Sequence, residues 1–154
     1  MTLFSERDTF WMQQALLLAA HAAQQNEVPV GAVLVLDDQV IGEGYNCPIS
    51  KHDPTAHAEI IALRQGAEKV GNYRLVNSTL YVTLEPCLMC AGAMVHARIK
   101  RLVYGATDLK AGAIVSMARA LDKSFLNHRV DHAGGLLARP CGEILSRFFQ
   151  ERRR

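Results

Sequence analysis

The chain has 154 residues, of which 49% are apolar and 21% charged, and its formal net charge at pH 7 is only +2. These values are ordinary for a soluble globular protein and fit a single domain, residues 1–154, with room for a hydrophobic core. The charge is too small to argue for nucleic-acid binding by itself. No apolar run approaches the length of a membrane span, and the N-terminus lacks the pattern of a signal peptide.

The cysteines indicate the compartment. Cys47 and Cys141 lie far apart in the sequence, and the other two cysteines form a Cys-x-x-Cys motif, so the spacing does not suggest a disulfide framework. A reducing compartment is therefore favoured. Together with the absence of a membrane span and a signal peptide, this predicts a cytoplasmic protein.

The N-terminal third predicts a helix followed by a hairpin. Ser5 begins a capping box, and apolar residues at helical spacing continue from there to about Gln25. Two apolar segments, 32–36 and 40–45, are separated by a turn signal and predict two buried strands. Asn46 ends the second strand, where its amide could either contact a ligand or cap a turn.

The next segment predicts a helix that carries a histidine and a glutamate. Asp53-Pro54 matches an N-cap followed by proline at the first helical position, and Gly71 is a stop signal. His57 and Glu59 do not share a face of a regular helix, so they can serve one site only from the first turn. There the positive end of the helix dipole favours thiolate and hydroxide over their protonated forms.

The middle of the chain contains the Cys-x-x-Cys motif. Its spacing predicts a crossover unit with parallel strands, formed by a strand, a helix and a strand at residues 79–84, 88–97 and 99–104. If Pro86 opens the helix, Cys87 and Cys90 project from one face of its first turn. Both thiolates can then hold one metal ion.

The last third is less regular. We expect a short helix and a strand there, at residues 115–121 and 129–132, and a final helix that begins at Pro140. The final helix carries Phe148 and Phe149 and ends in the basic run 152–154. These residues suit a stacked base beside phosphates. Alternatively, both phenylalanines belong to the core and the arginines are a solvated, frayed helix end.

Three residues of this chain form an incomplete set of zinc ligands. A structural zinc site has four protein ligands, whereas a catalytic site has three and leaves one position for water. His57, Cys87 and Cys90 supply three, and no second histidine lies at the short spacing that would complete a structural site. We therefore favour a catalytic site over a structural zinc knuckle. Glu59 is then the acid/base that moves the proton of the activated water.

The pattern His57-Ala58-Glu59 followed by Pro86-Cys87-x-x-Cys90 resembles the zinc-dependent nucleobase deaminases. Within them, further segments resemble the bacterial tRNA-specific adenosine deaminases, namely 54–60, 84–94, 127–129 and the terminal Phe148-Phe149 with its arginines. The resemblance implies a three-layer α/β/α, cytidine-deaminase-like fold with a central mixed sheet of about five strands flanked by helices. It also implies hydrolytic conversion of the wobble adenosine to inosine in an arginine tRNA anticodon, by a cytoplasmic homodimer that holds Zn²⁺.

The resemblance implies roles for individual residues as well. It makes Glu59 catalytic and His57, Cys87 and Cys90 the zinc ligands, and it places Asn46 against the base. It also places five residues near the anticodon loop, namely Asp108, Lys110, Phe149, Arg152 and Arg153. We further expect Glu85, at the end of a strand, to contribute its backbone carbonyl to the site.

Other functions remain open at this stage. A free-purine deaminase such as guanine deaminase shares His-Ala-Glu and Pro-Cys-x-x-Cys, and it is the main alternative. Free cytidine deaminases usually have cysteine where His57 stands, which disfavours them. A binding module would use zinc structurally and its basic tail for RNA, and a structural dimer scaffold would not need Glu59.

Overall fold

The computed structural model describes residues 3–153. A five-stranded sheet lies at its centre, with the strand order β2-β1-β3-β4-β5. Strand β1 pairs antiparallel with β2 and β3, whereas β4 pairs parallel with β3 and β5. The mixed sheet that we expected is therefore confirmed. Its strands are β1 (Gly31–Leu36), β2 (Gln39–Tyr45), β3 (Thr79–Leu84), β4 (Arg101–Ala106) and β5 (Asp131–Gly134).

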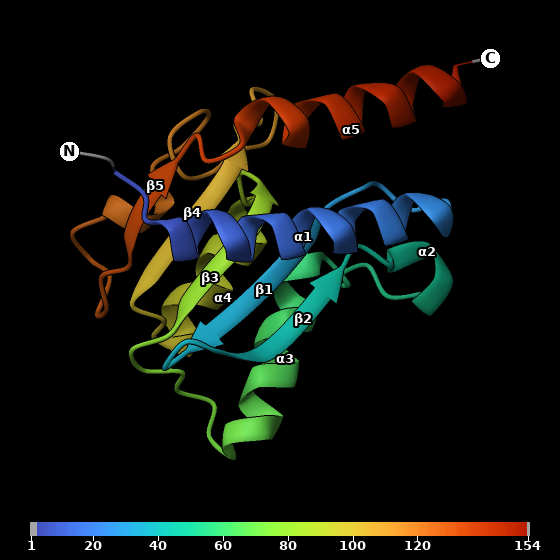
Figure 1. Ribbon diagram of the computed structural model, residues 1–154. Coiled ribbons are helices and arrows are strands. Elements are labelled where there is room, and N and C mark those ends of the chain that lie inside the picture. Colours follow the sequence, from blue (N-terminus) through green and yellow to red (C-terminus); the bar gives the residue numbers. More distant parts are fainter. Residues whose placement is uncertain (1–2, 154) are drawn as a thin grey trace.

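Helices cover both faces of the sheet (Figure 1). Helices α1 (Glu6–Gln24) and α5 (Ala138–Arg152) lie on one face, and α3 (Ala58–Val70) and α4 (Leu88–Ala97) lie on the other. Alternate residues of β1 show why two cores form. Ala32 and Leu34 pack with residues of α3 and α4, while Val33 and Val35 pack with Trp11 of α1. This is the predicted three-layer α/β/α arrangement, and it is confirmed.

The capping box at the start of α1 is confirmed, and it extends into the sheet. Ser5 Oγ accepts a hydrogen bond from the Asp8 N–H, and Asp8 Oδ2 accepts one from the Ser5 N–H, both at 3.0 Å. The buried Asp8 carboxylate also accepts hydrogen bonds from the Tyr81 hydroxyl at 2.6 Å and from both terminal nitrogens of Arg101 at 2.9 Å. One side chain therefore begins the helix and attaches it to β3 and β4.

The predicted helix start at Asp53-Pro54 is wrong. Asp53 Oδ1 instead accepts hydrogen bonds from the backbone N–H and the hydroxyl of Thr55, which forms a local turn. Helix α3 begins at Ala58, with His57 as its N-cap residue, and a separate short helix, α2 (Pro48–Lys51), precedes the turn. The first turn of α3 nevertheless carries Glu59, as predicted.

Other boundaries also differ from the sequence-based expectations. No helix forms at residues 115–121 beyond the short 3₁₀ turn Ala120–Asp122, because the backbone N–H groups before it bond elsewhere. Helix α4 begins at Leu88 with Cys87 as N-cap, so Pro86 lies outside it. Strands β4 and β5 begin two residues later in the sequence than expected. Helix α5 begins before Pro140, which lies in its first turn, where the missing proline N–H costs little.

Within residues 3–153, no helix has the length and apolar character needed to span a membrane.

Candidate active site

Helices α3 and α4, which lie on the same face of the sheet, begin close to each other. His57 and Cys87 are the N-cap residues of α3 and α4, and Cys90 lies in the first turn of α4. The Nδ1 atom of His57 lies 3.6 Å from the Sγ atoms of both Cys87 and Cys90. All three atoms lie within 4.8 Å of one another, so a single metal ion could contact all of them. The structure therefore brings together the three residues that we predicted as ligands.

The chemistry of these donors fits zinc. One imidazole nitrogen and two sulfurs are ligands that Zn²⁺ prefers, and a tetrahedral ion held by three of them keeps one open position. Among the residues that the structure describes, no other His, Cys, Asp or Glu joins this group. The arrangement thus matches a catalytic rather than a structural zinc site.

The pKa values of the two thiols shift in opposite directions. A hydrogen bond from the Cys90 thiol lowers the pKa of Cys87 to about 4, and the same bond raises the pKa of Cys90. One sulfur of the pair is therefore anionic near neutral pH. The N-termini of α3 and α4, which carry the positive ends of two helix dipoles, stabilise this charge.

Glu59 lies beside this cluster, on the first turn of α3. Its side chain is buried, with 4% of the residue exposed. Burial raises the pKa of Glu59 to about 7. A carboxyl group with this pKa can both accept and donate a proton near neutral pH, which is the property required of an acid/base catalyst.

A pocket of about 150 Å³ connects the predicted residues. His57, Glu59 and Cys87 line it, and Asn46 and Asp108 line it as well. Five of the predicted residues do not line it, namely Cys90, which is fully buried, and Lys110, Phe149, Arg152 and Arg153. The pocket therefore contains the chemical groups but only part of the predicted substrate contacts.

Asn46 serves the helix and the pocket together. Its Oδ1 atom accepts a hydrogen bond from the backbone N–H of Ala58 at 2.8 Å, and His57 provides no side-chain cap. The side-chain NH₂ group of Asn46 remains a donor beside the pocket. The two interpretations of Asn46 from sequence, a cap and a ligand contact, are thus compatible.

The segment after β4 forms another wall. Asp108 Oδ1 accepts hydrogen bonds from the backbone N–H groups of Lys110 and Ala111, each at 3.1 Å. Asp108 and Ala111 line the pocket, whereas the Lys110 side chain is exposed to solvent. Asp108 therefore lies at the pocket and Lys110 lies outside it on the same loop, and the contact of both residues with the anticodon loop stays a prediction.

The side chain of Glu85 is a feature that the sequence analysis missed. It is buried, and it accepts hydrogen bonds from the loop 108–116. Burial raises the pKa of this carboxyl group, but hydrogen bonds from Ser116, Val115 and Asp108 outweigh it, so the pKa lies below its ordinary value. The only sequence signal was a glutamate at the end of an apolar strand, which does not identify its partners.

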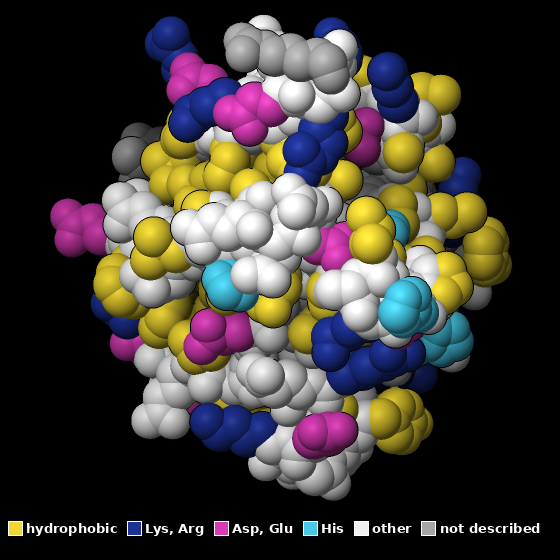
Figure 2. Space-filling view, turned by 90° about the vertical axis from the view of Figure 1, so that its right-hand side faces the viewer, with side chains coloured by type: hydrophobic (Ala, Val, Ile, Leu, Met, Phe, Trp, Pro, Cys, Tyr) yellow, Lys and Arg dark blue, Asp and Glu magenta, His cyan; other side chains and the backbone are white. Residues whose placement is uncertain are grey.

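The two phenylalanines near the end of α5 differ in burial. Phe148 is 7% exposed and belongs to the interior, while Phe149 is 44% exposed. The guanidinium group of Arg152 lies 4.0 Å from the centre of the Phe148 ring and donates a hydrogen bond to Asn26 at 2.9 Å. Arg153 is exposed. Figure 2 shows Lys and Arg side chains along the upper edge of the molecule, where α5 ends.

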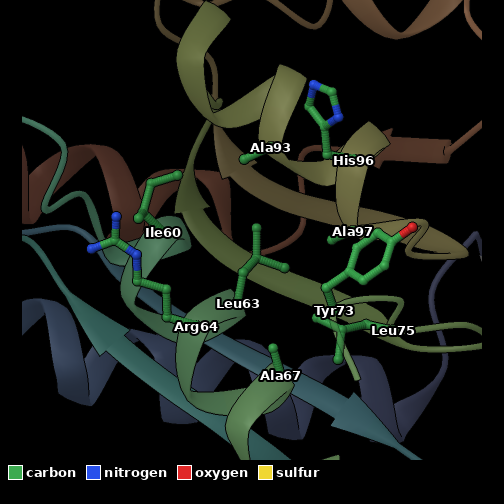
Figure 3. Close-up of a pocket in the computed structure, with 9 residues that line it drawn as sticks. All are labelled: Ile60, Leu63, Arg64, Ala67, Tyr73, Leu75, Ala93, His96 and Ala97. Atoms are coloured by element: carbon green, nitrogen blue, oxygen red, sulfur yellow. The ribbon is translucent and has the colours of Figure 1, made fainter. Parts of the chain in front are cut away.

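A larger hollow of about 380 Å³ lies between α3 and α4. Its walls come mainly from apolar side chains of these helices, including Leu63, Ala67 and Ala93, and Tyr73 borders it (Figure 3). Its lining includes neither Glu59 nor any of the three candidate metal ligands. We therefore assign the chemistry to the smaller pocket, which has the reactive groups.

Comparisons with known proteins agree with this geometry. The model of the MafB19-like deaminase family matches residues 6–153. A tRNA-specific adenosine deaminase from Haemophilus influenzae is 58% identical over 150 residues, which cover 97% of this chain and 87% of that protein. The chain belongs to the tRNA-specific adenosine deaminase family.

Solved structures extend the comparison. One comes from a study of A-to-I editing by tRNA:A34 deaminases at the wobble position of transfer RNA. It has a TM-score of 0.87 and 47% identity, covering 89% of this chain and 99% of that chain. A guanine deaminase from Nitrosomonas europaea has a TM-score of 0.81 at 20% identity, covering 96% of this chain and 86% of that chain. At that identity the likeness concerns the fold alone.

Proposed function

We propose that this protein hydrolytically deaminates adenosine to inosine at the wobble position of a tRNA, in the anticodon of an arginine tRNA. It acts in the cytoplasm, where tRNA is available, and the whole chain works as one deaminase domain. The observation that carries the proposal is the buried Glu59 in one pocket with His57 and Cys87, whose metal-binding atoms form one group with that of Cys90. Family membership supports the choice of substrate.

The residues of the pocket have complementary roles in this proposal. His57, Cys87 and Cys90 would hold Zn²⁺, which when bound would lower the pKa of a water molecule so that hydroxide is available near neutral pH. Glu59 takes one proton from the attacking water while the water oxygen adds to the purine carbon that carries the amino group, and it passes this proton to the ring nitrogen. Glu59 then takes the proton of the new hydroxyl group and gives it to the amino group, so the C–N bond breaks, ammonia departs and the carbonyl of inosine forms.

Recognition of the base and of the RNA involves different residues. The NH₂ group of Asn46 donates to the base, while Asp108 borders the small pocket that receives it. A pocket of this kind suits a nucleotide that is turned out of its loop. The exposed ring of Phe149 offers a stacking surface, and Lys110, Arg152 and Arg153 supply positive charge for phosphates.

Measurement of ammonia release tests the proposal. The protein is incubated with arginine tRNA and, separately, with free guanine, each with and without a zinc chelator. We expect release from tRNA only, and we expect chelation to abolish it. Release from guanine but not from tRNA would favour the free-purine deaminase, and release from neither would favour an RNA-binding module with structural zinc.

We also propose that the protein is a homodimer, in which a second copy covers the hollow between α3 and α4. Apolar side chains line this hollow, and Tyr73 at its border is 65% exposed. Removal of such a surface from water usually stabilises a dimer interface.

Light scattering tests the dimer. It should give twice the mass of one chain for the wild type and for Leu17→Arg, on the opposite face of the sheet. Tyr73→Arg should give a monomer, and a monomeric wild type would contradict the proposal.

A further inference from the structure

The carboxylate of Glu85 is surrounded by donors from one loop. Only 2% of this residue is exposed. Its Oε1 atom accepts hydrogen bonds from the Asp108 N–H at 3.0 Å and from the Ser116 hydroxyl at 2.5 Å. Its Oε2 atom accepts three more from backbone N–H groups, those of Ile114 at 3.1 Å, Val115 at 2.8 Å and Ser116 at 3.0 Å.

No cation neutralises this charge within the described part of the chain, where Glu85 forms no ion pair. Its stability depends instead on the loop's own N–H groups. Hydrogen bonds to an ionised acceptor are about twice as strong as those between neutral groups. The loop 108–116 has no regular secondary structure apart from turns, and these bonds attach it to the end of β3, beside the buried side chain of Ile114.

The loop also approaches Glu85 more closely than an ordinary residue would permit. A Cβ atom placed on Gly112 would lie 2.3 Å from the carboxyl carbon of Glu85. Two backbone hydrogen bonds join the same segments. The Ala113 N–H of the loop donates to the Pro86 carbonyl at 2.8 Å, and the Glu85 N–H donates to the carbonyl of Ala106, at the end of β4, at 2.8 Å. The loop therefore wraps around one side chain at the end of β3.

The position of this attachment relates it to the chemistry. Asp108 and Ala111 of the loop line the pocket that contains Glu59, and Glu85 also lines it. Building on the proposed function, we propose that Glu85 is a positioning residue: its carboxylate fixes the loop 108–116 as the wall that receives the substrate nucleotide. It touches the loop rather than the reacting atoms.

The chemistry of a Glu85→Gln substitution provides the test. The amide replaces one acceptor oxygen by an NH₂ donor that faces backbone N–H groups, at nearly unchanged volume. The loop then spends part of its time away from the sheet. When only a fraction of molecules has the competent loop, the apparent substrate affinity falls by that fraction, while the bound complex reacts normally.

The experiment combines hydrogen exchange with kinetics on the zinc-loaded protein. For Glu85→Gln we expect amide exchange in residues 108–116 to accelerate about tenfold and KM for tRNA to rise about tenfold, with kcat changed less than about threefold. Zinc content should not change. Ser116→Ala, which removes one of the bonds, should shift both quantities in the same direction by a smaller factor, and it serves if Glu85→Gln does not fold.

The matched control is Asp8→Asn, which alters another buried carboxylate with several partners that does not line the pocket. It should leave exchange in residues 108–116 and KM unchanged. Unaltered exchange in the loop of both Glu85→Gln and Ser116→Ala, or a fall in kcat at constant KM, would overturn the proposal. Amide exchange is measured without substrate. A wild type that is inactive on tRNA would therefore refute the proposed function, and exchange in the variants would still test the attachment of the loop to Glu85.

Discussion

The side-chain oxygen of Asn46 accepts a hydrogen bond from the backbone N–H of Ala58, 2.8 Å away, at the N-terminus of α3. The same helix turn carries His57 and Glu59. A residue at the end of β2 therefore fixes the start of the helix that carries the proposed acid/base and one candidate metal ligand. Its NH₂ group is left for the pocket.

Substitution of Asn46 separates these two contributions. Asn46→Asp keeps an acceptor for Ala58 but loses the NH₂ donor, so we expect near-normal stability and a large loss of kcat/KM. Asn46→Ala loses both, and should lower the free energy of unfolding by about 1 kcal/mol as well. Urea unfolding and deamination rates measure the two effects. If Asn46→Asp had wild-type activity, the NH₂ group would have no role in substrate binding.

Substitution of Glu59 tests the proton transfer. Glu59→Gln should keep the fold and one equivalent of zinc, because Glu59 is not among the candidate ligands. Deamination should be lost, since an amide cannot move a proton between water and the leaving group. Metal analysis and ammonia release on the same sample check both statements. Turnover near that of the wild type would show that Glu59 is not the acid/base.

The Asp8 cluster should make stability depend on pH in the acid range. Burial raises the pKa of this carboxyl group, but hydrogen bonds from Arg101, Tyr81 and Ser5 outweigh it and hold the pKa well below its usual value of 3.8. A lowered pKa in the folded state stabilises the protein above the unfolded-state value, and the contribution is lost as the pH falls further.

Asp8→Asn should therefore cost roughly 2–3 kcal/mol of unfolding free energy at pH 7, a value below that of a fully buried pair because Arg101 is partly exposed. The difference from the wild type should shrink progressively below about pH 4. Urea unfolding of both proteins at several pH values measures it. A difference that stays constant from pH 7 to pH 3 would contradict the assignment.

The two arginines at the end of α5 should behave differently. Arg153 is exposed, so Arg153→Ala should weaken tRNA binding, with a salt dependence reduced by about one counterion, and leave stability unchanged. Arg152 also contacts Phe148 and Asn26, so Arg152→Ala should lower the melting temperature as well. Binding titrations at several salt concentrations and thermal unfolding distinguish the two. Equal losses of stability in Arg152→Ala and Arg153→Ala would contradict the expected difference between the two arginines.

The sequence predicted the elements whose signals are local. The hairpin, the parallel β3–β4 unit and the capping box at Ser5 follow from residues that are neighbours in the chain, and all are confirmed. The start of α3 was missed because its cap comes from Asn46, 12 positions away. The loop at 115–121 was mistaken for a helix because its N–H groups bond to Glu85, about 30 residues earlier. Such contacts leave no periodic pattern.

The candidate site was likewise predictable only where its residues share a local sequence motif. Cys87 and Cys90 share a motif, and His57 and Glu59 share another, and the structure places both motifs in one cluster. Whether a residue proposed to contact the substrate reaches it depends on how far its side chain extends from its helix or loop, which spacing does not determine. Phe148 and Phe149 are adjacent in sequence, yet only the burial of each ring in the folded chain distinguishes them.

The most direct test of the central claim is sequencing of arginine tRNA after incubation with the zinc-loaded protein, with Glu59→Gln as the control. Inosine is read as guanosine during reverse transcription, so the product is visible at a single position. We expect conversion at the wobble adenosine with the wild type and none with the variant. An unconverted wobble position with the wild type, together with deamination of free guanine, would contradict the account.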